Sequence, residues 1–535
     1  MESSKETKKI IKTYCRGNLK RFLRETTLHG LKYLADDSIT LWEKSFFMCA
    51  FLAAIITTAN LIVNVYAKWI STPVIIGISP HATSILNIPF PAITVCNMNQ
   101  VLAGRVANYT PESEEGALLK IFCNSGVFSE DKVWEAPNFK NNNLKFEDFL
   151  NEHAQPCSKM LLSCSYGADG GNCSDLFQEI ISDEGFCCVF NILQPNFLLT
   201  RSTVRTSNMR KPNKARKPID WNPETGYPSD LPPKYTPRAA SGTGVTMGLS
   251  LVLDSALDEY YCSTTNGPGF KVGIHSPIES TSIKETAYVF PVGYETRVRI
   301  EVVSSEATEN LRTMPREDRQ CLFNGEENLL FYAHYSRRNC ESECQVKFIY
   351  EQCKCQPFNL PLIYENATIC GVQQVRCVQK VDDLWMKGTS GGDVCWDRCL
   401  PPCFDLSYKA DATMSPLRQF DYLTPPSILR NMSMDYVNKH VAVLHFYYRE
   451  SVFHGNVKNV YVGFTEFLSN TGGIMGLFLG FSFISVAEII YFAFMRPICE
   501  LITTLRKRRM VARKKKSLLV TRSQLQPSHR IVKVN

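Results

Sequence analysis

The amino-acid sequence predicts an α+β membrane protein in which two transmembrane helices flank a large, disulfide-rich extracellular domain. Two uncharged stretches indicate the helices: Phe46–Tyr66 has 21 residues, and Phe467–Met495 has 29 with Glu488 as its only charge. A helix needs about 20 apolar residues to span a bilayer core, so each stretch is long enough. Cysteine content indicates the outer domain, because 18 of the 21 cysteines lie between the two stretches.

The charges at the two ends of the chain predict its orientation. Residues 1–44 hold ten Lys or Arg against six Asp or Glu, and residues 496–535 hold twelve against one. Basic flanks stay in the cytoplasm, so both termini are expected there and the large loop outside. The basic tail at 506–516 favours anionic lipid over nucleic acid, with a solvated tail as the alternative. The expected divisions are a cytoplasmic segment 1–44, a helix 45–67, an extracellular domain 68–460, a pore helix 461–495 and a cytoplasmic tail 496–535.

The composition of the region between the stretches indicates an oxidising compartment. Its 18 cysteines are an even number, as a disulfide framework requires. All four N-x-Ser/Thr sequons also fall there, and such acceptors lie in surface loops of secreted domains. We therefore expect a glycosylated plasma-membrane protein with free thiols only outside this region. The sequons begin at Asn108, Asn172, Asn366 and Asn431, and the expected free cysteines are Cys15, Cys49 and Cys499.

Alternating apolar and polar residues predict strands in the outer domain. The runs Ala92–Cys96, Met247–Asp254 and Glu295–Val303 alternate in this way. His440–Tyr448 is apolar on both faces, so it should be a central strand covered on each side. The wide spacing of these strands suggests one sheet with insertions between its strands. The Pro-rich, basic segment Arg201–Arg238 is interpreted as an exposed loop.

The second half of the outer domain contains cysteines spaced four residues apart. Cys340 and Cys344 form one set, and Cys395, Cys399 and Cys403 form another. Positions i and i+4 share one face of a helix, so two antiparallel faces would pair like the rungs of a ladder. No His interleaves these cysteines, which disfavours zinc, and we expect no metal site. The spacing predicts the pairs Cys344–Cys395, Cys340–Cys399, Cys321–Cys403, Cys353–Cys377 and Cys355–Cys370.

The second uncharged stretch holds features that a plain membrane anchor does not need. Gly472, Gly476 and Gly480 recur every four residues, a stripe that lets helices approach closely. Glu488 is costly in a membrane unless it faces water or a partner. Gly480 and Ser482 mark a place where the helix could extend and expose carbonyls to a water-filled path. Such carbonyls above a ring of carboxylates form a cation filter, so we interpret the stretch as a pore. The alternative is a packing stripe in an anchor dimer.

Segments spread over nearly the whole chain resemble one known family. They are "HG" at 29–30, "FPAITVCN" at 90–97, the block 335–403, and "LSNTGGIMGLFLGFS" leading into "VAEI". Through them the sequence resembles the epithelial sodium channel/degenerin family, which includes the acid-sensing channels, and is most like its arthropod pickpocket branch. The resemblance implies a homo- or heterotrimer of related subunits that conducts sodium across the plasma membrane. It implies gating by an extracellular stimulus or constitutive activity, block by amiloride-like compounds, and no cofactor besides the permeant Na⁺.

The resemblance also implies an extracellular domain of palm, finger, knuckle, β-ball and helical thumb, with the thumb at about 321–403. Two more disulfides are implied, Cys96–Cys187 and Cys164–Cys173. The partners of Cys123, Cys157, Cys188 and Cys262 are left open.

Individual residues match the functional positions of that family. Gly480, Phe481 and Ser482 match the selectivity filter, although relatives carry Ser, Gly or Ala in the middle, and Glu488 matches the acid below it. Arg449 stands where acid-sensing relatives have an acid, so proton gating is not expected. The remaining matches are Ser469 with Asn470 at the degenerin position of the gate, Gly472, Gly473 and Gly476 at the pore-helix blocker site, and His29 with Gly30 at the cytoplasmic gating motif.

Three other interpretations fit a two-span topology, and the sequence favours each of them less. A trimeric channel gated by extracellular ATP needs a phosphate-binding Lys and Arg cluster that nothing here resembles. An ectoenzyme needs a phosphate loop, a Gly-x-Ser-x-Gly or a His-Glu-x-x-His, and the outer domain has none. A non-conducting receptor or adhesion protein would not need Glu488. We therefore expect a channel and not an enzyme.

Overall fold

The computed structural model describes residues 17–523 except 124–145, 201–215, 264, 281, 361, 363–366, 387–394, 396, 419–428 and 430–431. The chain divides into two compact units. The helical unit contains residues 1–73 and 460–535, and the β-rich unit contains residues 74–459.

The first long helix of the helical unit is α3 (Leu41–Ser71), which includes the first predicted span. It starts five residues before the uncharged stretch because Thr40 and Glu43 form a capping box: the Glu43 carboxylate accepts from the Thr40 N–H at 2.6 Å. Apolar side chains such as Phe46 and Ile56 point outward and are more than 60 % exposed in the single chain, as lipid-facing residues would be. The short helix α2 (Leu31–Ala35) precedes it.

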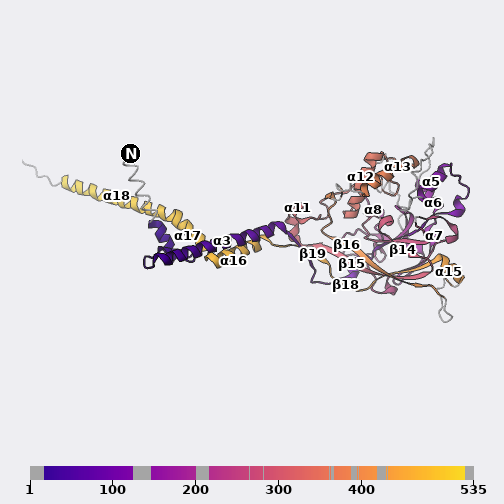
Figure 1. The fold of residues 1–535 in the computed structure, drawn as a ribbon, viewed down its shortest axis with the longest axis horizontal. Coiled ribbons are helices and arrows are strands. Elements are labelled where there is room, and N and C mark those ends of the chain that lie inside the picture. The colour runs from indigo at the N-terminus through magenta and orange to yellow at the C-terminus, as the bar shows by residue number, and fades with distance from the viewer. Residues whose placement is uncertain are drawn as a thin grey trace, which may run out of the picture. The chain divides into compact units, whose positions relative to one another are not determined.

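The second predicted span is a series of helical segments rather than one helix. They are α16 (Phe464–Leu479), α17 (Phe483–Ile490), a π-helical turn (Tyr491–Met495) and α18 (Arg496–Ser523). The chain bends by 68° between α16 and the helical run that begins at Phe483. Figure 1 shows α16 running beside α3, and Trp69 of α3 stacks on Phe467 of α16 with ring centroids 4.8 Å apart. Together with α3, the bent pair gives up to two membrane spans in the part of the chain that the structure describes.

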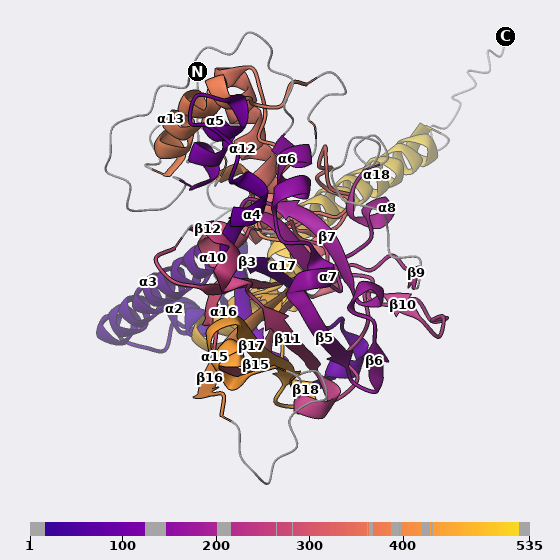
Figure 2. The same cartoon turned by 90° about the vertical axis from the view of Figure 1, so that its right-hand side faces the viewer.

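The β-rich unit is built on an eight-stranded sheet in the order β1-β19-β15-β17-β11-β5-β6, with β16 also paired to β15. Figure 2 shows β15, β17 and β11 side by side. β17 is central and apolar, and Val441 to Leu444 are all buried as expected for a strand covered on both faces. The strands are β1 (Val74–Ile78), β5 (Leu161–Tyr166), β6 (Asp169–Gly171), β11 (Leu249–Asp254), β15 (Tyr294–Ala307), β16 (Asp405–Pro416), β17 (Val441–Tyr448) and β19 (Asn456–Val460).

The hypothesis of one sheet is wrong. The strand predicted from Ala92 is in a separate five-stranded sheet, ordered β14-β13-β3-β8-β7. Both sheets contribute to one apolar core, in which Phe90 meets Tyr166, Phe190 and Tyr448 at ring distances of 5.2, 6.1 and 5.3 Å. Alternation predicts a strand and its buried face but not its neighbours. The strands are β3 (Ala92–Asn97), β7 (Phe177–Ser182), β8 (Gly185–Phe190), β13 (Gly269–His275) and β14 (Tyr288–Pro291).

Small strands and helices complete the β-rich unit. The paired strands outside the two sheets are β2 (Thr83–Ser84) with β18 (Val452–Phe453), β4 (Asn99–Leu102) with β12 (Tyr260–Ser263), and β9 (Lys217–Pro218) with β10 (Tyr235–Thr236). The helices are α4 (Ala103–Val106), α5 (Glu114–Cys123), α6 (Phe146–His153), α7 (Cys157–Met160), α8 (Pro195–Leu198), α10 (Ile283–Thr286), α11 (Arg316–Arg319), α12 (Arg337–Cys353), α13 (Val375–Met386) and α15 (Met434–His440).

The segment interpreted as an exposed loop is only partly exposed. Residues 201–215 lie outside the described residues, but Trp221 is 2 % exposed and packs in an apolar cluster with Ile192 and Phe331. The prolines and lysines around Trp221 led to the prediction of an exposed loop, because local composition indicates the average exposure of a segment and not the burial of a single side chain.

Nine disulfides cross-link the described part of the β-rich unit. The structure forms all five pairs expected from the four-residue spacing, with Cys340 and Cys344 on α12 facing Cys399 and Cys395. It also forms Cys96–Cys187 and Cys164–Cys173. The four cysteines left open pair as Cys123–Cys262 and Cys157–Cys188.

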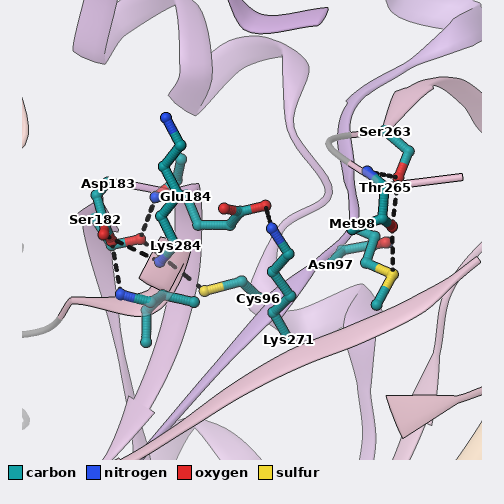
Figure 3. Close-up of polar contacts among 12 residues, drawn as sticks. Cys96, Asn97, Met98, Ser182, Asp183, Glu184, Ser263, Thr265, Lys271 and Lys284 are labelled. Atoms are coloured by element: carbon teal, nitrogen blue, oxygen red, sulfur yellow. Dashed lines mark hydrogen bonds and ion pairs between the residues drawn. The ribbon is translucent and has the colours of Figure 1, made fainter. Parts of the chain in front are cut away.

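A buried ion pair joins the β7–β8 turn to β13 (Figure 3). Lys271 donates to the Glu184 carboxylate at 2.6 Å, and these residues are 8 % and 3 % exposed. The adjacent Asp183 accepts from the backbone N–H groups of Ile283 and Lys284 at 2.9 and 3.0 Å. Burial raises the pKa of Asp183, while these hydrogen bonds oppose the rise. The turn is therefore tied both to β13 and to the start of α10.

Replacing Lys271 by methionine is expected to lower the free energy of unfolding by roughly 3 kcal/mol, because the buried Glu184 carboxylate loses the ammonium group that donates to it. Thermal unfolding of the purified protein at neutral pH tests this. Lys284→Met is the matched control, since the Lys284 side chain is exposed and only its backbone takes part. Equal melting temperatures for the two variants would contradict the expectation.

The Glu279 carboxyl group interacts electrostatically with charged residues of α12 and β16. The charges that act on it are those of Arg338 and Glu341 on α12 and of Asp405 on β16. Burial raises the pKa of Glu279 from 4.5 to about 7, more than Arg338 lowers it. A carboxyl whose pKa is raised by folding stabilises the fold when protonated. This stabilisation is fully present below a pH near 4.5 and is lost as the pH rises through about 7.

Replacing Glu279 by glutamine is therefore expected to stabilise the protein in alkaline solution. At about pH 8 the free energy of unfolding should rise by up to about 3 kcal/mol, and the gain should vanish near pH 4. Thermal unfolding across this pH range measures the difference, with the exposed Glu351→Gln on α12 as control. A gain of the same size at every pH would refute this explanation.

Candidate pore and filter

The second span is broken at the tract predicted to be the filter. α16 ends at Leu479, and Gly480 adopts the left-handed conformation with φ 65° and ψ 23°. Ser482 is extended and caps α17, since its hydroxyl accepts from the Ser485 N–H at 3.4 Å. Glycine enters the left-handed region with little strain, so it stands where the helix has to end. Between the two half-helices, the Phe481 N–H donates to the Met475 carbonyl at 3.3 Å and the Ser482 N–H to the Ser485 hydroxyl at 3.1 Å, so the chain leaves the regular helix here with these N–H groups bonded.

The His29–Gly30 motif lies against this break. The His29 N–H donates to the Leu479 carbonyl at 3.0 Å. A Cβ added to Gly480 would stand 2.5 Å from Cδ2 of the His29 ring, so the ring occupies the space that a side chain would need. Gly30, with φ 80°, turns the chain into α2 immediately afterwards. The His29–Gly30 motif and the predicted filter tract are thus in direct contact, although they are far apart in the sequence.

Glu488 is held by the residues just before that motif. Its carboxylate accepts from the Thr27 N–H at 3.0 Å, the Thr27 hydroxyl at 3.2 Å and the Thr26 hydroxyl at 3.4 Å. The Thr27 hydroxyl also lies 2.9 Å from the Ser485 hydroxyl. An acid within a span is tolerated when donors replace the water it loses, and Thr26 and Thr27 supply them.

More contacts secure the segment before these threonines. The Asn18 side-chain amide donates to the Phe492 carbonyl at 3.0 Å. That carbonyl lies in the π-helical turn, where the regular ladder of backbone hydrogen bonds is interrupted. Phe22 and Phe492 meet edge to face with centroids 5.5 Å apart, and Arg496 lies 3.6 Å from Glu25. The N-terminal segment therefore packs along the whole second half of the span.

The small residues of α16 leave an open face. Ser469 and Asn470 are exposed, and a Cβ at Gly472 or Gly473 would meet no described atom within 4 Å. At Gly476 it would meet only the Phe481 carbonyl, at 3.8 Å. The structure does not bring these residues together with Glu488, which lies beyond the break.

Sequence reasoning found the break and the acid but missed Thr26 and Thr27. The available signal was their place directly before His29, since hydroxyl and backbone donors next to a motif that reaches the filter can bind its acid.

The remaining candidate residues are the glycosylation sequons and the free cysteines. Asn108 and Asn172 are exposed, and Asn366 and Asn431 lie outside the described residues. Cys49 and Cys499 are free thiols, and Cys15 is likewise not among the described residues. In the described ranges, no three His, Cys, Asp or Glu side chains are placed to hold a metal ion.

A broken apolar span with a satisfied carboxylate, joined to a large disulfide-linked domain, is the arrangement expected of a subunit of a two-span membrane channel. Comparison with protein families agrees: the amiloride-sensitive sodium channel model matches residues 22–492. The chain belongs to the amiloride-sensitive sodium channel family.

The relatives include pickpocket proteins and an acid-sensing ion channel. Pickpocket protein 28 of Drosophila melanogaster is 39 % identical over 91 % of this chain and 80 % of its own. Pickpocket protein 11 of the same fly is 23 % identical over 89 % and 76 %. Acid-sensing ion channel 4 of Rattus norvegicus is 21 % identical over 88 % and 78 %. Among solved structures, a proton-activated chloride channel aligns over 84 % of this chain and 96 % of its own with a TM-score of 0.28 and 7 % identity, too slight a likeness to argue from.

Membership makes the chain a subunit of a multimeric plasma-membrane ion channel, in a family of channels and not of enzymes.

Proposed function

We propose that the chain is one subunit of a trimeric, sodium-selective channel that an extracellular stimulus opens or that is active without one. The observation that carries this proposal is the break at Gly480–Ser482, with Glu488 on the short helix α17 that follows it. At a helix break, backbone carbonyls of the filter tract can turn toward a water-filled path and replace the water around a small cation, which a nearby carboxylate attracts. Three copies around an axis would turn these groups into two rings.

In this proposal, Gly480, Phe481 and Ser482 form the filter and Glu488 the acid ring below it. Ser469 and Asn470 line the gate on the open face of α16, and amiloride-like blockers bind near Gly476. Both termini are cytoplasmic, and the basic surface of α18 meets anionic lipid. The β-rich unit is the extracellular palm, finger, knuckle, β-ball and thumb, with the thumb around α12 and α13. The partners are identical or related subunits.

The function is tested by expressing the Ser469→Val form in oocytes under voltage clamp. Ser469 is exposed on the open face of α16, so the larger side chain fits the subunit but would crowd the gate between subunits. We expect a steady inward sodium current that amiloride blocks and that is much larger than the current of the matched Ser469→Ala form. Surface expression of the valine form without current, alone and together with a conducting relative, would contradict the proposal.

A further inference from the structure

A cavity of about 710 Å³ opens on the β-rich unit beside the Cys164–Cys173 disulfide. The residues that line it belong to α7 and the start of β5, and to β7 and the segment that joins β6 to β7. Leu161 and Phe177 supply apolar surface and are each 5 % exposed. Ser158, Gln178 and Glu179 supply polar groups. An apolar wall with a few polar groups is what a small organic ligand needs.

One wall residue is itself an acceptor of carbohydrate. Asn172 lines the cavity and begins the sequon Asn172-Cys173-Ser174. Its side chain is exposed, and its Oδ1 accepts from the Ser174 N–H at 3.2 Å. Cys173 is buried and bonded to Cys164, so the attachment point cannot drift away from the cavity. A sugar on Asn172 would start at the mouth of a space large enough to take it.

We propose that this cavity seats the first sugars of an N-linked glycan carried by Asn172. N-acetylglucosamine has an apolar ring face, which Phe177 and Leu161 can cover, and an acetamide and hydroxyls, which Ser158 and Gln178 can bind. A covalently attached sugar gives up little translational freedom on docking, so weak contacts are enough to hold it. The seated glycan would join α7 to β7 as part of the fold. The inference rests on the extracellular placement in the proposed function.

Asn108 provides an internal comparison. It is also an exposed sequon, but it follows α4 and does not line the cavity. A glycan there would extend into solvent, whereas the Asn172 glycan would be shielded at its base. The two sites should therefore differ in how readily an enzyme reaches the bond between sugar and asparagine.

The test is a time course with peptide:N-glycosidase F on the full-length protein purified from animal cells in detergent. The enzyme leaves aspartate at each released site, so mass spectrometry measures Asn108 and Asn172 separately. In the native protein, release at Asn172 should be about tenfold slower than at Asn108 or slower still, because the sugar must first leave its seat. After reduction and denaturation both sites should react alike.

A variant that fills the cavity makes the test specific. Ser158 is exposed, so Ser158→Tyr should leave the fold intact while displacing the sugar, and native release at Asn172 should then match that at Asn108. Similar native rates in the unmodified protein would overturn the inference, as would a bare Asn172 beside a glycosylated Asn108. If both asparagines are bare, the extracellular placement fails together with the inference.

Discussion

Replacing Gly480 by valine is expected to abolish the sodium current of the Ser469→Val channel while the protein still reaches the cell surface. Gly480 has φ 65°, a conformation that costs a residue with a Cβ about 1–2 kcal/mol, and more for a β-branched one. The new Cβ would also stand 2.5 Å from the His29 ring. Both effects would displace the filter tract or the His29–Gly30 motif that contacts it. The current under voltage clamp and surface biotinylation measure the two quantities.

The control for this prediction is Leu477→Val on the same helix. Leu477 is 76 % exposed in the single chain and has ordinary helical geometry, so its replacement should leave the current near its starting size. A Gly480→Val channel that still carries full sodium current would show that the left-handed glycine is not needed for conduction.

Replacing Glu488 by glutamine is expected to lower the single-channel sodium conductance by about tenfold. The amide keeps an oxygen that can accept from the Thr27 N–H, so the loop stays in place and the main change is the loss of charge. A carboxylate in a low-dielectric passage raises the local concentration of cations by about 10-fold or more. Single-channel recording in excised patches measures the effect directly.

The Glu488→Asp variant distinguishes the effect of the negative charge from the effect of the contact between Glu488 and Thr27. Aspartate keeps the charge but is too short to reach Thr27 as glutamate does, so conductance should be retained better than in the glutamine form, while opening becomes less stable. If glutamine and aspartate reduce conductance equally, Glu488 acts by holding the N-terminal segment and not by attracting sodium.

The parts of this molecule that follow local rules could be predicted from its sequence. The apolar runs, the left-handed glycine before a capping serine, and the four-residue cysteine spacing on α12 each depend on neighbours within one or two turns. The break at Gly480–Ser482 was therefore foreseeable, as was the set of rungs that Cys340 and Cys344 begin.

Features that depend on tertiary placement could not be predicted. The partner of Cys188 is one such feature: Cys188 follows Cys187 on β8, so its side chain points to the opposite face of the strand and bonds to Cys157. The division into two sheets and the burial of Trp221 likewise depend on which elements meet. The hydrogen bond from Thr27 to Glu488 joins residues 461 positions apart, and only the place of Thr27 next to the His29–Gly30 motif pointed to it.

The central claim is that the broken span of this chain forms a path for sodium. The most direct test is the reversal potential of the Ser469→Val current, first with external sodium replaced by N-methyl-D-glucamine and then with external chloride replaced by gluconate. We predict a large shift to negative potentials with the first exchange and no shift with the second. A reversal potential that does not shift when sodium is replaced, or that shifts when chloride is replaced, would contradict the claim.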